Sequence, residues 1–155
     1  MDFIRIRTLP QLDSFNKDLM GLFYEYANRT ELWKNANELY RFVAQSIMFS
    51  DHVFCVFIID KEIVGFLLCN LLGNSKKSIL YVDEFYCPKH GMKAWDCMRA
   101  IARTFGVNEL WGKAEEKIYR TYRKHVKNAD VSKQQIVRVK LWVAGEVNQK
   151  ASQDR

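Results

Sequence analysis

The sequence predicts a single α/β domain, more closely α+β, in which helices flank a mixed and mostly antiparallel central sheet. The length of 155 residues suits one domain. With 48% hydrophobic and 14% aromatic residues, the chain can bury a full core. Segments with strand-like and helix-like periodicity follow one another in the order β-α-α-β-β-β-α-β-α-β. We expect the domain to span residues 1–143 and a polar tail to follow over residues 144–155.

The N-terminal part predicts an edge strand and two helices. Residues 3–7 alternate between apolar and charged side chains, and Leu9-Pro10 ends that pattern. Apolar residues at helical spacing then predict helices over residues 12–26 and 32–47. Thr30, in the polar stretch between them, is the expected N-cap of the second helix.

The middle of the chain predicts an antiparallel meander of three strands. Two continuous apolar runs, at residues 53–59 and 63–72, suit strands that are buried on both faces. Residues 60–62 form the tight turn between them. The third strand is expected over residues 79–87, after a polar turn.

The C-terminal part predicts a crossover and two further strands. The expected elements are a helix over residues 92–105 with Gly106 at its C-terminus, a strand at 109–113 parallel to its predecessor, a helix over 115–126, a loop at 128–130 and a strand at 135–143.

The segment from Ile79 to Phe105 carries the clearest chemical signal. Two carboxylates, Asp83 and Glu84, lie near the middle of its strand. Pro88 ends strand pairing, and Gly91 leaves a bare backbone where the next helix begins. Because the first N–H groups of a helix have no partner within it, this turn has the geometry of a phosphate-binding site.

Charge and cysteine content narrow the class of protein. The net charge is +6, and residues 88–155 carry 15 Lys and Arg against 7 Asp and Glu, while residues 1–87 are slightly acidic. A basic half suits an anionic partner or a solubilising surface.

The four cysteines show no C-x-x-C spacing and are expected to be reduced core thiols, with no metal site. With no apolar run of membrane length and no signal-peptide pattern, we expect a cytoplasmic protein without a membrane partner.

Residues 81–88 (YVDEFYCP) and 118–124 (IYRTYRK), within this order of elements, resemble the GCN5-related N-acetyltransferase (GNAT) family over about residues 3–143. The resemblance implies acetyl-CoA as acyl donor. It places the pyrophosphate loop at His90, Gly91, Met92, Lys93, Ala94 and Trp95, with Lys89 adding charge, and the pantetheine edge at Phe85, Tyr86 and Cys87. It also implies Tyr122 as the general acid and Glu84 as the general base, or Asp83 if the register turns that side chain to the cleft. Because neighbours on a strand point to opposite faces, we expect one of the two carboxylates at the cleft.

The phosphate loop departs from the family pattern. His90 stands where Arg or Gln is usual, Lys93 takes a glycine position and Trp95 a small-residue position. Such a Trp either obstructs the approach of pyrophosphate or turns into the core. The Gly-Phe that often follows the later tyrosine segment is replaced by His125-Val126.

These features predict an acyl-CoA-dependent N-acyltransferase, most simply one that transfers acetyl from acetyl-CoA to a primary amine of a small molecule or protein. The alternative is a catalytically inactive GNAT-like binding or structural protein with a protein partner, such as a phage-encoded or virion-associated one. Under this alternative, Asp83 and Glu84 are ordinary polar residues of a strand, and Tyr122 is a core residue. Nucleic-acid binding through the basic half ranks last, because no recognised nucleic-acid motif accompanies it.

Overall fold

A computed structural model describes residues 1–30, 32–74, 77–113, 129–131 and 136–140. The elements in chain order are β1 (Asp2–Ile6), α1 (Leu9–Ser14), α2 (Asn16–Thr30), α3 (Ala36–Ser46), β2 (His52–Ile59), β3 (Glu62–Asn74), β4 (Lys77–Tyr86), α4 (Gly91–Thr104), β5 (Glu109–Lys113), β6 (Ala129–Val131) and β7 (Ile136–Lys140).

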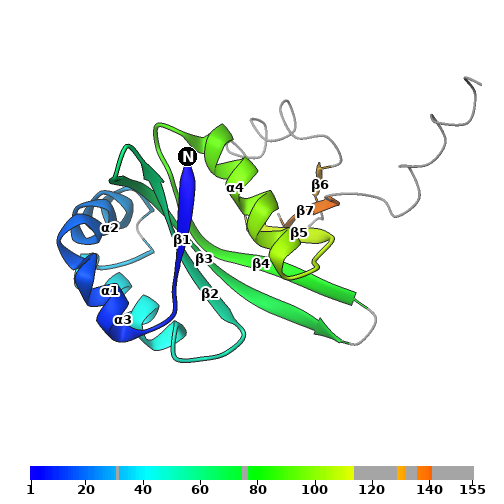
Figure 1. The fold of residues 1–155 in the computed structure, drawn as a ribbon, viewed down its shortest axis with the longest axis horizontal. Coiled ribbons are helices and arrows are strands. Elements are labelled where there is room, and N and C mark those ends of the chain that lie inside the picture. The colour runs from blue at the N-terminus through cyan, green and yellow to red at the C-terminus, as the bar shows by residue number, and fades with distance from the viewer. Residues whose placement is uncertain (31, 75–76, 114–128, 132–135, 141–155) are drawn as a thin grey trace, which may run out of the picture.

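The described strands form one mixed sheet in the order β1-β2-β3-β4-β5-β7-β6. All neighbouring pairs are antiparallel except β4 and β5, which run parallel and are joined through α4. Helix α4 lies on one face of this sheet, and α1, α2 and α3 lie on the other (Figure 1). The predicted fold class is therefore confirmed.

Each face of the sheet has its own apolar core. Beneath α4, Trp95, Met98 and Ile101 pack on inward-facing residues of β2 to β5. On the opposite face, side chains of α1 to α3 such as Phe23 pack against the other side of the same strands. Strands β2 and β3 are consequently buried on both faces, which explains why their sequences are continuous apolar runs rather than alternating ones.

Two predicted turns are confirmed in detail. Ile59 pairs with Glu62, so Asp60 and Lys61 form a two-residue hairpin, and both have positive φ as a type I′ turn requires. At the end of α4, Gly106 has a φ of 64°. Its N–H and that of Val107 donate to carbonyl groups of the last helical turn, which completes a glycine C-cap.

Three local predictions are wrong. The first helical region divides into α1 and α2, because Thr8 caps a separate short helix that has Pro10 in its first turn. Thr30 ends α2 instead of capping α3, since its hydroxyl donates to the carbonyl of Tyr26, and Asn35 is the true N-cap of α3. Ala129 and Asp130, expected in a loop at residues 128–130, instead form β6 together with Val131 and pair with β7.

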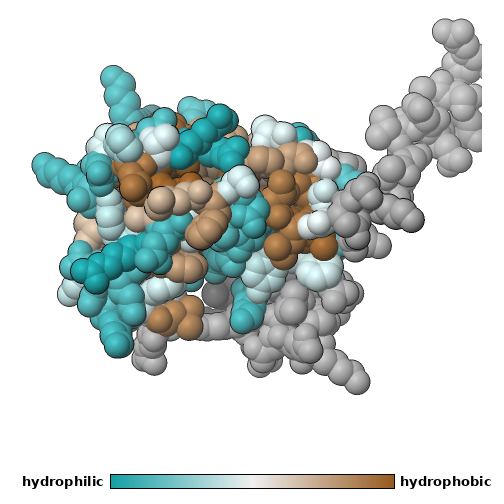
Figure 2. All heavy atoms as spheres, turned by 90° about the horizontal axis from the view of Figure 1, so that it is seen from below, coloured by the Kyte–Doolittle hydropathy of each residue, from teal (hydrophilic) through white to brown (hydrophobic). Residues whose placement is uncertain are grey.

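The helix expected over residues 115–126 lies outside the described residues, as does the polar tail. Among the described helices, none is long and apolar enough to cross a membrane. On the face shown in Figure 2, apolar residues form separate patches with hydrophilic residues between them.

Candidate active site

A β-bulge in β4 shapes the candidate site. Leu68 of β3 pairs with Glu84, while the next residue, Cys69, pairs with Val82, so Asp83 is an extra residue on β4. A bulge of this kind bends the strand and interrupts the alternation of side chains.

The described pairing between β4 and β5 ends at the same point. Their parallel pairing runs from Ile79–Glu109 to Val82–Gly112 and does not continue among the described residues. At the last pair, a Cβ on Gly112 would lie 3.3 Å from the Cβ of Val82, so a glycine permits this close approach. Residues 83–87 therefore have no described strand partner on the β5 side, and their backbone groups there can pair with an extended ligand.

Glu84 is buried on the face covered by α1 to α3, with 7% of its surface exposed. The Tyr26 hydroxyl of α2 donates a 2.5 Å hydrogen bond to Glu84 Oε2. The pKa of Glu84 is raised, mainly by burial, although the hydrogen bond from Tyr26 opposes the rise. The buried indole N–H of Trp33 also lowers this pKa, yet it falls short of a complete hydrogen bond. A carboxyl with a raised pKa is suited to accept a proton near neutral pH.

Asp83 lies on the same face as Glu84, which corrects the prediction that only one of them can. Asn70 Nδ2 donates a 2.6 Å hydrogen bond to Asp83 Oδ2, and Asn70 follows Cys69 on the face of β3 opposite α4. The bulge is the physical reason, since it turns two consecutive residues of β4 to one side. Burial raises the pKa of Asp83, while His52 and Asn70 oppose the rise.

The N-terminus of α4 fits the predicted phosphate site. His90 precedes the helix and its side chain makes no capping hydrogen bond. The first intrahelical bond runs from the Ala94 N–H to the His90 carbonyl, so the N–H groups of Gly91, Met92 and Lys93 come before the hydrogen-bonded ladder. The first turn carries no acidic residue, and a Cβ on Gly91 would meet no atom within 4 Å. These residues can therefore hold phosphate oxygens.

The remaining loop residues divide between solvent and core. Lys89, Met92 and Lys93 are exposed. Trp95 is buried in the core under α4. It therefore turns into the core, the second of the two predicted alternatives, and does not obstruct the turn.

Cys87 is a core thiol beside the end of β4. It is 5% exposed, and burial raises its pKa to about 11. A Cβ on Gly65 would lie 2.4 Å from the Tyr86 carbonyl oxygen and 2.9 Å from Cys87 Sγ, so β3 and β4 pack tightly here. Cys87 can thus contribute its backbone, and not a thiolate, to a ligand.

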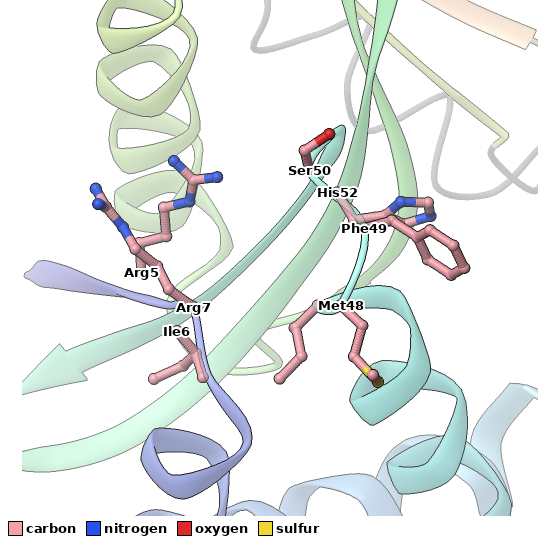
Figure 3. A pocket seen from close by; sticks show the side chains of 8 residues that line it. Arg5, Ile6, Arg7, Met48, Phe49, Ser50 and His52 are labelled. Carbon is pink, nitrogen blue, oxygen red and sulfur yellow. The ribbon is translucent and has the colours of Figure 1, made fainter.

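A shallow hollow of about 240 Å³ lies near the start of β2, apart from the α4 N-terminus. Arg5 and Arg7 lie on one side of it (Figure 3). The rings of His52 and Phe49 lie on the other side and point away from the arginines, with their centroids 5.8 Å apart. Among the described residues, no group of His, Cys, Asp and Glu side chains could hold a metal ion.

The residues around Glu84 were not predicted from the sequence. Tyr26 and Trp33 fit helical core patterns, and only the fold brings them to a strand more than 50 residues later. Tyr86 adds a second tyrosine, whose ring centroid is 5.4 Å from that of Tyr26 and whose hydroxyl donates to Glu25 at 3.0 Å. Tyr122, the predicted general acid, lies outside the described residues.

Comparison with known proteins supports the fold independently. No family model and no curated protein sequence matches the chain. Among solved structures, a GNAT-family acetyltransferase from Staphylococcus aureus is similar with a TM-score of 0.64 and 11% identity, over 90% of this chain and 99% of that one. PaiA N-acetyltransferase from Thermoplasma acidophilum, solved in complex with coenzyme A, is similar with a TM-score of 0.57 and 13% identity, over 90% and 99%.

A third similar structure is an aminoglycoside acetyltransferase from an uncultured soil metagenomic sample. Its TM-score is 0.61 and its identity 16%, over 84% of this chain and 90% of that one. The chain therefore has the fold of the GCN5-related N-acetyltransferases, as its sequence predicts.

Proposed function

We propose that this protein is an acyl-CoA-dependent N-acyltransferase, in the simplest case one that transfers acetyl from acetyl-CoA to a primary amine. The observation that carries the proposal is that the described pairing of β4 with β5 ends at Val82, several residues before the turn that leads into α4. A free strand edge followed by an open helix N-terminus suits a ligand with an extended arm and phosphate groups.

Each part of the site has a role in this proposal. Acetyl-CoA supplies an acetyl thioester. The backbone of Phe85, Tyr86 and Cys87 pairs with its pantetheine arm, and the first turn of α4 with Lys89 and Lys93 holds its phosphates. His90 lies beside them at the turn.

Proton transfer is assigned to two further residues. The amine must be neutral to attack the thioester carbon, so Glu84 takes its proton, directly or through water. Tyr26 holds the Glu84 carboxylate in place for this step. Tyr122 gives a proton to the sulfur as the C–S bond breaks, a role that rests on the family resemblance.

The first test is calorimetric titration with acetyl-CoA and with CoA. We expect both to bind, and the Lys89→Ala/Lys93→Ala double variant to bind each at least tenfold more weakly. Lys17→Ala is the matched control, since Lys17 is an exposed lysine of α2. Absence of binding at millimolar ligand contradicts the proposal.

The second test is turnover. Release of the CoA thiol is followed with a panel of short alkyl amines, amino-acid amides, peptides with free N-termini and peptides with a lysine side chain. Glu84→Gln should reduce turnover far more than it weakens CoA binding. Equal turnover in the variant would remove Glu84 from the mechanism.

One observation favours the second candidate, a non-catalytic GNAT-like binding protein. Glu84 is largely buried and already accepts a hydrogen bond, as a structural carboxylate does. CoA binding without transfer to any amine of the panel would support this candidate.

A further inference from the structure

The two carboxylates of β4 form an unusual pair. Consecutive residues of a regular strand point to opposite faces, but the bulge puts Asp83 and Glu84 on one face. Glu84 is the deeper of the two and is held by Tyr26, whereas Asp83 is partly exposed and is held by Asn70. Two carboxylates on one face of a strand repel each other when both are ionised, so each makes ionisation of the other less favourable.

We propose that Asp83 is a positioning residue for Glu84, whose negative charge makes the Glu84 carboxylate a stronger acceptor for the proton of the substrate amine. This inference extends the proposed function, and the effect of Asp83 on catalysis depends on that function. The coupling between the two carboxylates is a property of the folded chain and can be tested by itself.

The charged and titratable groups around the pair support this assignment. From α2, Tyr26 donates to Glu84, while Glu25 is engaged by the Tyr86 hydroxyl and the Arg29 guanidinium lies over the Tyr86 ring. From β2, His52 lowers the pKa of the Asp83 carboxyl, and Nδ1 of His52 lies 3.0 Å from Asp51 Oδ1. Of the groups that act on Glu84, Asp83 is the like charge, and it raises the pKa of Glu84.

Burial raises the pKa of Asp83, and its hydrogen bond with Asn70 opposes that rise. Asn70 donates to one of its oxygens, and this bond favours the ionised form. Asn70 itself pairs with His52 of β2 and with Tyr81 of β4 in the strand register, so its backbone is fixed by both neighbouring strands. Asp83→Asn can still accept the Asn70 bond, which makes it a conservative way to remove the charge.

The direct test is an NMR titration of Glu side chains labelled with ¹³C at the carboxyl carbon. The signal that Glu84→Gln abolishes is that of Glu84. We expect its titration midpoint to move to lower pH in Asp83→Asn and to return in Asp83→Glu, which restores the charge. Asp60→Asn, in the exposed β2–β3 turn, removes one negative charge elsewhere and should leave the midpoint in place.

An unchanged Glu84 midpoint in Asp83→Asn overturns the proposal. The catalytic arm uses the fastest amine of the panel and follows kcat/KM against pH. Its acid limb should move to lower pH in Asp83→Asn, together with a lower plateau. If the NMR midpoint moves and the acid limb does not, Asp83 acts on Glu84 but Glu84 is not the base. If no amine is acetylated, the proposed function fails while the NMR result still decides the coupling.

Discussion

Tyr26 in α2 donates a hydrogen bond to Glu84 in β4, 58 residues further along the chain. The ring of Tyr26 also lies edge-on to Phe66, with centroids 5.4 Å apart, so the hydroxyl is held by packing as well as by its acceptor. This contact joins the helical layer to the strand that carries the candidate base.

Tyr26→Phe removes the hydroxyl and keeps the ring. Hydrogen bonds to charged groups contribute about 1.5–3 kcal/mol, so we expect the free energy of unfolding in urea to fall by about that amount at neutral pH. Loss of the donor should also raise the pKa of Glu84 further. Tyr24→Phe is the matched control, because Tyr24 is 63% exposed. Equal effects of the two substitutions would mean that the Tyr26 bond contributes nothing specific.

Stability should depend on pH through Glu84. Its pKa is higher in the folded than in the unfolded chain, so the folded state binds more protons over the interval between these values. The contribution of Glu84 to stability is therefore complete below its unfolded pKa and is lost as pH rises through its folded pKa. Glu84→Gln removes this loss. The free energy of unfolding of the variant, minus that of the wild type, should increase from pH 4 to pH 7 in urea titrations; a constant or falling difference contradicts the assignment.

Gly65→Ala should destabilise the protein. The added Cβ would lie 2.4 Å from the Tyr86 carbonyl oxygen, which is a backbone atom that cannot rotate away. Overpacking of this kind costs about 1–3 kcal/mol or more, measured as a lower urea midpoint. Gly91→Ala serves as the control for stability, since the space around Gly91 is open and the change should stay within about 0.5 kcal/mol. A Gly65→Ala protein as stable as wild type would show that β3 and β4 are spaced more loosely.

The cysteines should react slowly with thiol reagents in the native protein. All four are free and buried in the core under α4, and burial raises the pKa of Cys55 to about 12 and that of Cys87 to about 11. Because the thiolate is the reactive form, we expect no fast-reacting thiol at pH 7.5 and four in denaturant, counted with a chromogenic disulfide. A fast native thiol would place one cysteine at the surface.

The parts of the fold with strong local signals were predicted well. The apolar runs of β2 and β3, the stripe of α4 and the glycine at its end follow from periodicity and backbone conformation, which are local properties. The division between α1 and α2 depends on a single cap at Thr8, and β6 forms through pairing with β7, which local composition does not specify.

The site was harder to predict than the fold. The strand–turn–helix segment around Gly91 could be recognised because all its residues are adjacent in the sequence. The partners of Glu84 could not, since Tyr26 and Trp33 have the same spacing as ordinary core residues. Strict alternation also failed at Asp83, because a bulge depends on how the neighbouring strand pairs.

The bulge exists because β4 has one residue more than β3 at this point. Leu68–Glu84 and Cys69–Val82 would be successive pairs of a regular ladder if residue 83 were absent. A chain shortened by that one residue would keep Val82 and Glu84 on their present faces but would lose the bend that the bulge gives β4. Deletion at this position would therefore change the course of β4, which most substitutions would leave in place.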